Sequence, residues 1–254
     1  MYCVLQNGGS MMDERAEHEI QHGEFIARGN TELIWGWDTP AGHVRAKRRA
    51  KLIDIGARLG PDSNALEIGC GTGMFTEMFA QTGCSIIAVD ISATLLKKAE
   101  ARKLPKEKVR FMQKRFEDCD VDGPFDAVIG SSILHHLQLN DGLTRIYELL
   151  KPNGIMCFAE PNMLNPQVVA ERKLRWMFPY VSPDETAFVR WALRNDLQKT
   201  GFQDIEIVPF DWLHPSVPRQ LINLVSAIGR VIEKTPLLCE FSGSLHVKAV
   251  RPSD

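Results

Sequence analysis

The segment Ala65-Leu-Glu-Ile-Gly-Cys-Gly-Thr-Gly73 decides the fold prediction. A short apolar run of strand type leads directly into a turn with three glycines, and residues 73–81 then have a helical pattern. Glycine has no Cβ, so such a turn bends sharply and lets a ligand approach its backbone. The helix that follows presents free N–H groups and a partial positive charge to a carboxylate or phosphate. The segment therefore predicts a nucleotide-type site at a strand–helix junction.

Further strand-length apolar runs alternate with helical stretches along the chain. The predicted strands are 65–68, 85–89, 109–112, 125–129 and 155–159, and the predicted helices between them are 73–81, 92–102 and 139–150. Lys151-Pro-Asn-Gly154 has the composition of a turn that ends the last of these helices and starts the fifth strand. Alternation of this kind, with nearly continuous apolar strands, predicts an α/β fold with a parallel sheet covered by helices on both faces.

The segments on either side of this unit are predicted to add helices, loops and two more strands. The expected helices are 11–28, 44–59, 183–200 and 219–233, the expected strands are 202–210 and 244–250, and residues 30–43 are expected to form a loop. We assign residues 1–60 to N-terminal helices and a lid segment. Residues 61–254 form the main domain, with cap insertions at about 162–183 and 211–242.

Composition excludes several classes of partner and compartment. The formal net charge of −2 gives no general field for attracting nucleic acid or an anionic membrane. No apolar run approaches the roughly 20 residues that span a bilayer, and Met1–Ser10 lack the features of a secretory signal. The six cysteines are scattered, which suits a reducing compartment. We expect a cytoplasmic protein without a nucleic-acid partner and without stable membrane insertion; the oligomeric state is not indicated.

Two classes of cofactor compete for the glycine-rich turn. Asp90 ends the second strand, where an acidic side chain can accept both ribose hydroxyls of a nucleotide. The dinucleotide fingerprint Gly-x-Gly-x-x-Gly needs a third glycine at the position that Met74 occupies. This departure weakens the hypothesis of an NAD-dependent oxidoreductase, which stays as an alternative.

Four segments in order resemble motifs of class I S-adenosylmethionine-dependent methyltransferases. Leu66–Gly73 is similar to motif I, including its acidic residue, and Ile87–Ser92 to the second motif. Phe125–Leu137 resembles the fourth-strand motif of small-molecule members, and Leu149–Gly154 the turn before strand five. The resemblance covers about residues 62–161. It implies a Rossmann-like, doubly wound sheet of seven strands, with the seventh antiparallel between the fifth and sixth.

The same resemblance implies a cofactor and the residues that bind it. The methyl donor would be S-adenosylmethionine and the product S-adenosylhomocysteine. Asp90 would hold the ribose, and Ile91 would pack on the adenine. The family usually has an aspartate where Arg115 stands, so the adenine amine would rely on Glu117 or Asp118 instead. The full implied set is Glu67, Gly69, Cys70, Gly71, Gly73, Asp90, Ile91, Phe116, Glu117 and Ser131.

Methyl transfer from a sulfonium needs alignment, water exclusion and sometimes a base. His135 and His136 lie just past strand four, beside the donor methyl in this fold, and are candidate bases for the acceptor's proton. Alternatively, they cap a helix and line the pocket. Glu160 and Asn162, at the end of strand five, are expected either to orient a polar acceptor or to cap a loop.

Aromatic residues before and after the core bear on the acceptor. Trp35 and Trp37 are expected either to form a lid over the methyl group or to pack the N-terminal helix on the sheet. The apolar face of 219–233 is expected mainly to pack on the sheet. Together with the aromatic segment 176–180 it also permits a shallow membrane contact or a large apolar pocket, which suits a small-molecule acceptor that is apolar or lipid-like.

His18 and His22 have helical spacing, but the sequence points to no further ligands, so we expect no metal site. The basic run 47–51 is either a solvated helix side or a contact for an acidic acceptor. The predicted activity is methyl transfer to an acceptor that the sequence does not identify. A non-catalytic protein that binds S-adenosylmethionine is a further alternative.

Overall fold

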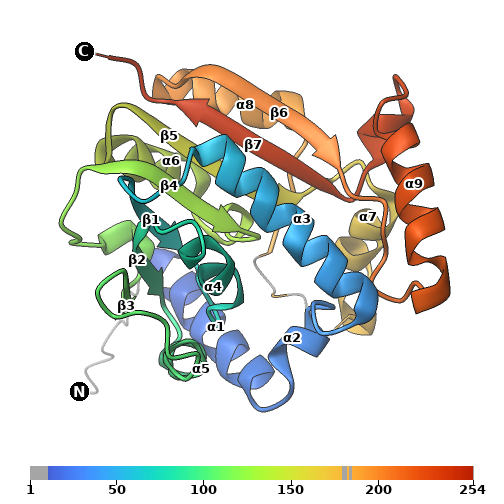
Figure 1. The fold of residues 1–254 in the computed structure, drawn as a ribbon, viewed down its shortest axis with the longest axis horizontal. Coiled ribbons are helices and arrows are strands. Elements are labelled where there is room, and N and C mark those ends of the chain that lie inside the picture. Colours follow the sequence, from blue (N-terminus) through green and yellow to red (C-terminus); the bar gives the residue numbers. More distant parts are fainter. Residues whose placement is uncertain (1–10, 179–181, 183–184, 254) are drawn as a thin grey trace, which may run out of the picture.

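The computed structural model describes residues 11–178, 182 and 185–253. Within these residues, seven strands form one sheet in the order β3-β2-β1-β4-β5-β7-β6 (Figure 1). The strands are β1 (Asn64–Ile68), β2 (Ser85–Asp90), β3 (Val109–Gln113), β4 (Phe125–Ser131), β5 (Leu150–Pro161), β6 (Gln203–Phe210) and β7 (Ser244–Val250). Strands β1 to β5 pair in parallel, whereas β7 runs antiparallel between β5 and β6. The predicted Rossmann-like sheet, including its antiparallel seventh strand, is confirmed.

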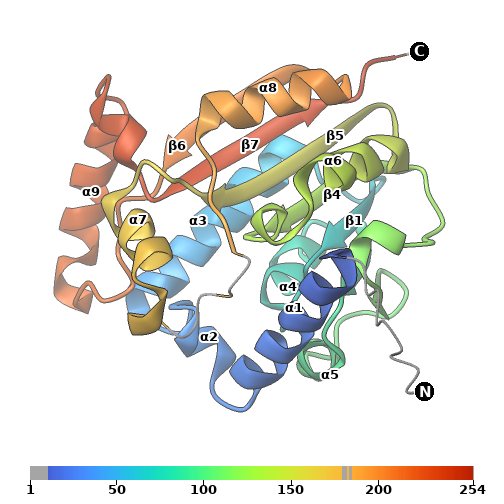
Figure 2. The same cartoon turned by 180° about the vertical axis from the view of Figure 1, so that it is seen from behind.

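Helices cover both faces of this sheet (Figures 1 and 2). The helices are α1 (Met11–Ala27), α2 (Thr31–Ile34), α3 (Pro40–Ala57), α4 (Met74–Ala80), α5 (Ala93–Glu100), α6 (Leu139–Leu149), α7 (Pro166–Lys173), α8 (Arg190–Thr200) and α9 (Ile222–Ile232). Short 3₁₀ turns are η1 (Phe116–Asp118), η2 (Leu134–His136), η3 (Arg175–Met177), η4 (Arg219–Leu221) and η5 (Leu238–Phe241). One core cluster joins α3, α4 and α5 to the sheet, and a second joins α6 and α8 to its other face.

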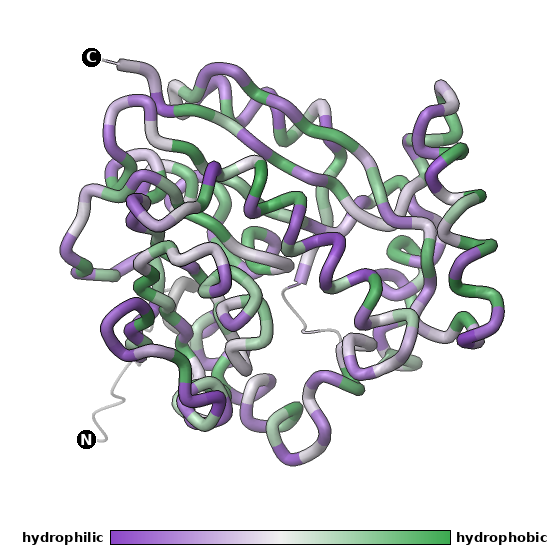
Figure 3. Tube along the Cα trace, viewed as in Figure 1, coloured by the Kyte–Doolittle hydropathy of each residue, from purple (hydrophilic) through white to green (hydrophobic). Residues whose placement is uncertain are grey.

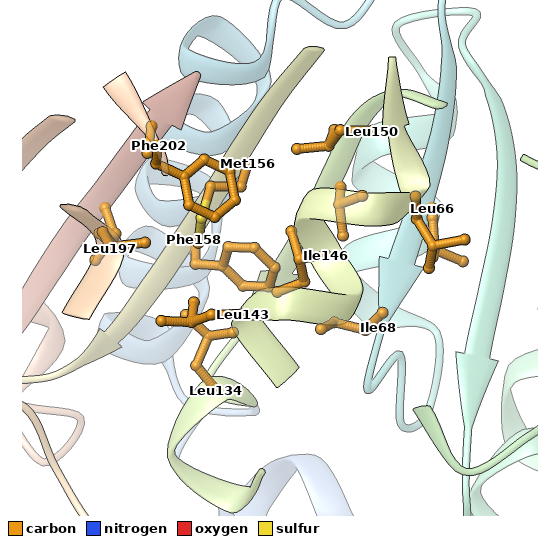
Figure 4. Packing of buried hydrophobic residues seen from close by; sticks show 14 of the residues in the cluster. Leu66, Ile68, Leu134, Leu143, Ile146, Leu150, Met156, Phe158, Leu197 and Phe202 are labelled. Atoms are coloured by element: carbon orange, nitrogen blue, oxygen red, sulfur yellow. The ribbon is translucent and has the colours of Figure 1, made fainter. Parts of the chain in front are cut away.

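The two core clusters follow from the alternation of side chains along each strand. In β1, Leu66 and Ile68 point to the face that α6 covers, while Ala65 points to the face that α3 covers. Figure 4 shows Phe158 of β5 lying against Leu143 and other residues of α6. Because both faces are buried, the central strands are apolar throughout, which is the pattern that the sequence predicts for a parallel sheet.

The N-terminal part of the chain departs from its prediction. The predicted loop 30–43 contains the short helix α2, and α3 begins at Pro40 rather than at residue 44. The Thr39 hydroxyl caps α3 by accepting a hydrogen bond from the Gly42 N–H at 2.9 Å, and proline occupies the first turn. Thr-Pro is a recognised helix start, so the signal was present in the sequence. Helix α3 packs against β4, β5 and β7, and the domain division at residue 60 stays a prediction.

Two features predicted for the chain after β4 also differ from those in the structure. The predicted turn Lys151–Gly154 lies inside β5, where the pairing with β4 shifts register. Asn153 has φ +63°, in the left-handed region, and its N–H donates to the Arg251 carbonyl, so this irregular part of β5 is bonded to the backbone beyond β7. Helix α8 begins at Arg190, and residues 185–189 before it are not helical. The predicted start of that helix at Pro183, the aromatic Tyr180 and residues 1–10 lie outside the described residues.

Figure 3 shows hydrophobic and hydrophilic residues interleaved along the helices, α9 included. None of the helices within residues 11–178 and 185–253 has the combined length and apolar character needed to cross a membrane.

Candidate cofactor and transfer site

A cavity of about 820 Å³ lies at the carboxyl ends of the parallel strands. It extends from the glycine-rich turn, past η2, to α7 and residues 211–216, and α1, α2 and the start of α3 form its N-terminal wall. A smaller cavity of about 80 Å³ adjoins it and shares Asp90, Ile133 and His136 as lining residues. The larger volume is near the upper end of the range of about 300–1,000 Å³ for small-molecule sites.

The glycine-rich turn connects β1 to α4 through three residues in the left-handed region. Gly69, Gly71 and Gly73 have φ values of +64°, +53° and +73°. A Cβ on Gly69 would lie 2.4 Å from the Ile133 side chain, so this position requires glycine for space as well as for conformation. The turn therefore brings bare backbone to the wall of the larger cavity, as the sequence predicts.

Asp90 holds the turn from the end of β2. Its Oδ2 accepts a hydrogen bond from the Gly71 N–H at 2.7 Å, and its Oδ1 accepts one from the Ser92 N–H at 2.8 Å. Burial raises the pKa of Asp90, and these two donors oppose the rise. The carboxylate lines both cavities, and each oxygen retains a second lone pair for a ligand hydroxyl.

Most of the implied cofactor residues line a cavity. Those on the larger cavity are Gly69, Cys70, Gly71, Asp90, Ile91 and Ser131, and those on the smaller one are Phe116 and Glu117, with Asp90 and Ile91 on both. Glu67 and Gly73 line neither, so their contact with the cofactor stays a prediction.

The physical reason lies in strand alternation and helix packing. Alternation along β1 turns Glu67 away from the cavity, whereas Gly73 starts α4 against Ala99 of α5. Glu67 is 2% exposed, and its Oε2 has no hydrogen-bond partner among the described residues. Burial raises its pKa to about 8.

The smaller cavity is the candidate adenine end. Phe116 is buried in its wall, and Glu117 lines it, whereas the Asp118 side chain is 68% exposed. Arg115, which stands where the family usually has an aspartate, has its Nε 3.4 Å from Asp118 Oδ2 and 3.7 Å from Glu117 Oε2. Of the two carboxylates left open by the sequence, the geometry favours Glu117.

His135 lies between two carboxylates, those of Glu160 and Glu185. It is 2% exposed, its Nδ1 lies 2.6 Å from Glu160 Oε2, and its Nε2 lies 3.3 Å from Glu185 Oε1. Burial opposes the charged form, but the hydrogen bonds to Glu160 and Glu185 raise the pKa of His135 to about 9. Both ring nitrogens are therefore protonated at neutral pH, so His135 lacks the free lone pair that a base needs. This geometry argues against His135 as the predicted base.

His136 is the histidine that lines both cavities. Its Nδ1 lies 2.9 Å from Glu19 Oε2 of α1, and Glu19 Oε1 accepts a hydrogen bond from the Ser182 hydroxyl at 2.7 Å. Burial works against the ionised form of Glu19, but His136 and Ser182 lower its pKa overall. The Arg15 guanidinium also donates to the His136 carbonyl at 2.7 Å. Contacts from α1 thus fix this residue, and no local sequence pattern indicates them.

Glu160 and Asn162, expected either to orient the acceptor or to cap a loop, do not line the cavity. Glu160 is fully buried, and its Oε1 accepts hydrogen bonds from the Ile133 and Leu134 N–H groups, both at 3.0 Å. The Asn162 amide donates to the carbonyls of Glu240 and Ser242 at 2.7 and 2.8 Å. Both side chains satisfy backbone groups of neighbouring turns, in agreement with the capping alternative.

Trp35 and Trp37 both line the larger cavity. A Cβ on Gly71 would lie 3.2 Å from the Trp35 ring, so this ring covers the glycine-rich turn. The Trp37 ring lies edge-on to Phe75, with centroids 5.5 Å apart, and 5.3 Å from the Arg49 guanidinium. These contacts combine packing with a position at the cavity wall, so the lid role stays a prediction.

Arg49 is a candidate site residue that the sequence does not single out. It belongs to the basic run 47–51, yet it is 3% exposed and lines the larger cavity. Its guanidinium donates to the hydroxyls of Ser131, Ser132 and Ser244 and to the Ala159 carbonyl. Burial lowers its pKa to about 10.

Within the described residues no carboxylate forms an ion pair with Arg49, and its Nε has no hydrogen-bond partner. A buried cation at a cavity wall without a direct counter-ion suits an anionic group on a ligand.

Comparisons with known proteins agree with this geometry. A family profile described as "Methyltransferase domain" matches residues 66–156. The ubiquinone biosynthesis O-methyltransferase of Nitrobacter winogradskyi is 32% identical over 162 residues, which are 57% of this chain and 60% of that protein. The malonyl-[acyl-carrier protein] O-methyltransferase of Magnetococcus marinus is 35% identical over 122 residues, 46% of this chain and 44% of that one. The chain thus spans about 60% or less of the length of these curated relatives.

Solved structures share the fold at low sequence identity. The N-methyltransferase NodS from Bradyrhizobium japonicum, in complex with S-adenosylhomocysteine, has a TM-score of 0.63 and 17% identity, with 93% of this chain and 100% of that chain covered. Phosphoethanolamine N-methyltransferase 2 of Haemonchus contortus has a TM-score of 0.60 and 17% identity, with 91% and 60% covered. The profile match, the sheet order and the glycine-rich turn together make this chain similar to class I S-adenosylmethionine-dependent methyltransferases.

Proposed function

We propose that the protein transfers the methyl group of S-adenosylmethionine to a small-molecule acceptor and releases S-adenosylhomocysteine. One observation carries the proposal: a single cavity joins the Gly69–Thr72 turn and Asp90 to His136 and to the cap segments around α7 and residues 211–216. Such a cavity has a cofactor end and a second end, as a reaction between two ligands requires.

The lining residues suggest how the cofactor lies. The ribose hydroxyls would bind Asp90, and the adenine would enter the smaller cavity beside Ile91, Phe116 and Glu117. The carboxylate of the amino-acid end would then face Arg49, whose charge lacks a direct counter-ion within the described residues. In this orientation the methyl group points along the cavity toward η2.

We assign the contact with the acceptor to His136, because it faces the cavity and the Arg15 guanidinium fixes its backbone by donating to its carbonyl. The in-line displacement transfers an already activated methyl group, so alignment and exclusion of water contribute most of the catalysis. The two curated relatives described above are named O-methyltransferases, which favours an oxygen acceptor. Pro166, Val168 and Leu213 at the far end of the cavity suit an acceptor with an apolar part.

The two alternative functions, an oxidoreductase and a protein that only binds the cofactor, explain fewer of these observations. Met74 is buried at the start of α4, where the dinucleotide fingerprint needs glycine, and the relatives are named methyltransferases rather than oxidoreductases. A protein that only binds the cofactor does not need the part of the cavity beyond His136. A reducing cytoplasm remains part of the proposal, since the five cysteines within the described residues are free. We also propose that no nucleic acid is bound.

Binding titrations with S-adenosylhomocysteine and NADH test the proposal. We expect S-adenosylhomocysteine to bind and NADH not to. Asp90→Asn should weaken S-adenosylhomocysteine by roughly 10- to 100-fold, because a hydrogen bond to a charged group contributes about 1.5–3 kcal/mol. Asp62→Asn, at an exposed aspartate, is the matched control. Preference for NADH, or unchanged affinity in Asp90→Asn, would overturn the assignment. Labelled-methyl transfer across a metabolite library would then identify the acceptor.

A further inference from the structure

We propose that His135, His136 and Glu185 bind a divalent metal ion, of which Zn²⁺ fits best, and that this ion holds an acceptor oxygen. Each side chain offers one ligand atom, and these atoms all lie within 4.8 Å of one another. All three residues line the larger cavity, so an ion held there would be accessible to a second ligand. The inference rests on the proposed function for the identity of that ligand.

The donor set and its spacing suit zinc. Two histidines and one glutamate, with a fourth position left open, form a ligand set of catalytic zinc sites. Ligand atoms about 2.0–2.1 Å from a tetrahedral ion lie about 3.3 Å from one another. The His135 Nε2 and Glu185 Oε1 atoms are 3.3 Å apart. The carboxylate oxygen and the imidazole nitrogen are thus already as far apart as two ligand atoms of one tetrahedral ion.

Both histidines have a carboxylate on the ring nitrogen that would face away from the ion. Glu160 Oε2 lies 2.6 Å from Nδ1 of His135, and Glu19 Oε2 lies 2.9 Å from Nδ1 of His136. Metal-binding histidines commonly donate their second ring N–H to a carboxylate, which fixes the tautomer and the ring orientation. For His135 this leaves Nε2 as the ligand atom, whereas the Nδ1 of His136 lies near Glu19 without a hydrogen bond to it.

Glu185, the third proposed ligand, is also positioned by neighbouring hydrogen-bond donors. Arg172 Nη2 lies 2.5 Å from Glu185 Oε1, and the Ser182 N–H donates to Glu185 Oε2 at 3.0 Å. These contacts come from α7 and from the chain around residue 182, so the cap positions the carboxylate against η2. Ordering of a ligating carboxylate by neighbouring hydrogen bonds is a usual feature of metal sites.

An ion would replace a proton of the cluster. His135 carries a proton on each ring nitrogen, so an ion bound to Nε2 would displace the proton that now faces Glu185. Three carboxylates, those of Glu19, Glu160 and Glu185, lie around the two histidines and are buried or largely so, and water therefore screens their attraction for a cation poorly.

The open position of the ion defines a substrate class. A hydroxyl oxygen that binds there would lie in the same cavity as the cofactor turn, and a coordinated hydroxyl loses its proton more readily. The new bond would join the methyl carbon to this oxygen, the sulfur–carbon bond would break, and the hydroxyl proton would leave to water. His136 then contacts the acceptor through the ion. Phenols and other acceptors with a coordinating hydroxyl are the expected substrates.

Metal titration of the chelator-treated full chain tests the inference without an activity assay. Calorimetry with Zn²⁺ should show one equivalent bound, and Co²⁺ should develop the intense visible absorption of a tetrahedral site. Glu185→Gln and His136→Gln should each weaken Zn²⁺ binding at least tenfold. The melting temperature of each variant shows whether it is folded, and one folded variant is enough for the test. His43→Gln, at an exposed histidine paired with Asp38, is the control and should bind normally.

Two results would overturn the metal site: no uptake by the wild-type chain, or uptake that both folded ligand variants retain. The first would mean that hydrogen bonds and protons alone satisfy the cluster. S-adenosylhomocysteine titrated into the same metal-free protein separates this outcome from failure of the proposed function. Cofactor binding with no metal uptake refutes the metal site alone, and absent cofactor binding refutes the methyltransferase proposal.

Discussion

Glu67 should make the stability of the cofactor-free protein depend on pH. Burial raises the pKa of this carboxyl from 4.5 to about 8, and the charge of Asp90 adds to the rise. The folded chain therefore keeps a proton that the unfolded chain loses above pH 4.5, so stability falls as pH rises toward 8. Each pH unit in this window corresponds to about 1.4 kcal/mol, or roughly 3 kcal/mol between pH 5 and pH 7.

Glu67→Gln removes this ionisation at nearly constant shape. A chain of this size shifts its melting temperature by about 2–4 °C per kcal/mol. Between pH 5 and pH 7 the wild-type melting temperature should therefore fall by about 6–12 °C relative to that of the variant. Differential scanning calorimetry at four pH values measures the difference, and Glu107→Gln, at an exposed glutamate, controls for general effects of pH. Parallel curves for wild type and Glu67→Gln would refute the reasoning.

Four other substitutions test separate parts of the site. Gly73→Ala should lower the free energy of unfolding, measured in urea, by about 1–3 kcal/mol. The added Cβ would lie 2.9 Å from the Cβ of Ala99, and the backbone has φ +73° at this position. Gly60→Ala, where a Cβ would meet open space, is the control and should change the free energy of unfolding little. Arg49→Met should weaken S-adenosylhomocysteine at least tenfold in calorimetry through loss of a charged partner, and unchanged affinity would remove Arg49 from the cofactor site. His135→Gln and His136→Gln should each lower turnover at saturating cofactor, and wild-type turnover in both across pH would exclude the histidines from catalysis.

Local patterns were sufficient for the strands and the cofactor turn, whereas the order of the sheet was implied by the resemblance to methyltransferase motifs. Glycines at 69, 71 and 73 have positive φ in the structure, as their succession in a strand–helix turn indicates. Asp90 contacts the turn backbone because the parallel pairing of β1 and β2 brings the ends of these strands together. Apolar runs identified the strands, since a strand buried on both faces has few polar residues. Boundaries were less accurate where a cap or a bulge decides them, as at Pro40 and Lys151–Gly154.

The transfer end of the cavity could not be predicted in this way. Glu160 was expected either to orient the acceptor or to cap a loop, and in the structure its carboxylate accepts hydrogen bonds from the backbone of the turn after β4. Arg49 looked like part of a basic surface run, and only the packing of α3 across the sheet buries it. In both cases the residues that surround the side chain are distant in sequence, and local periodicity carries no information about them.

The sequence alone thus determined the strands, the glycine-rich turn and the position of Asp90, because these depend on turn residues and on apolar runs, and the resemblance to methyltransferase motifs implied the order of the sheet. Tertiary structure alone decided that His135 and His136 meet Glu19, Glu160 and Glu185. These carboxylates come from α1, from the end of β5 and from the segment before α8, and they converge only when the chain closes over the sheet. The choice of acceptor depends on that convergence.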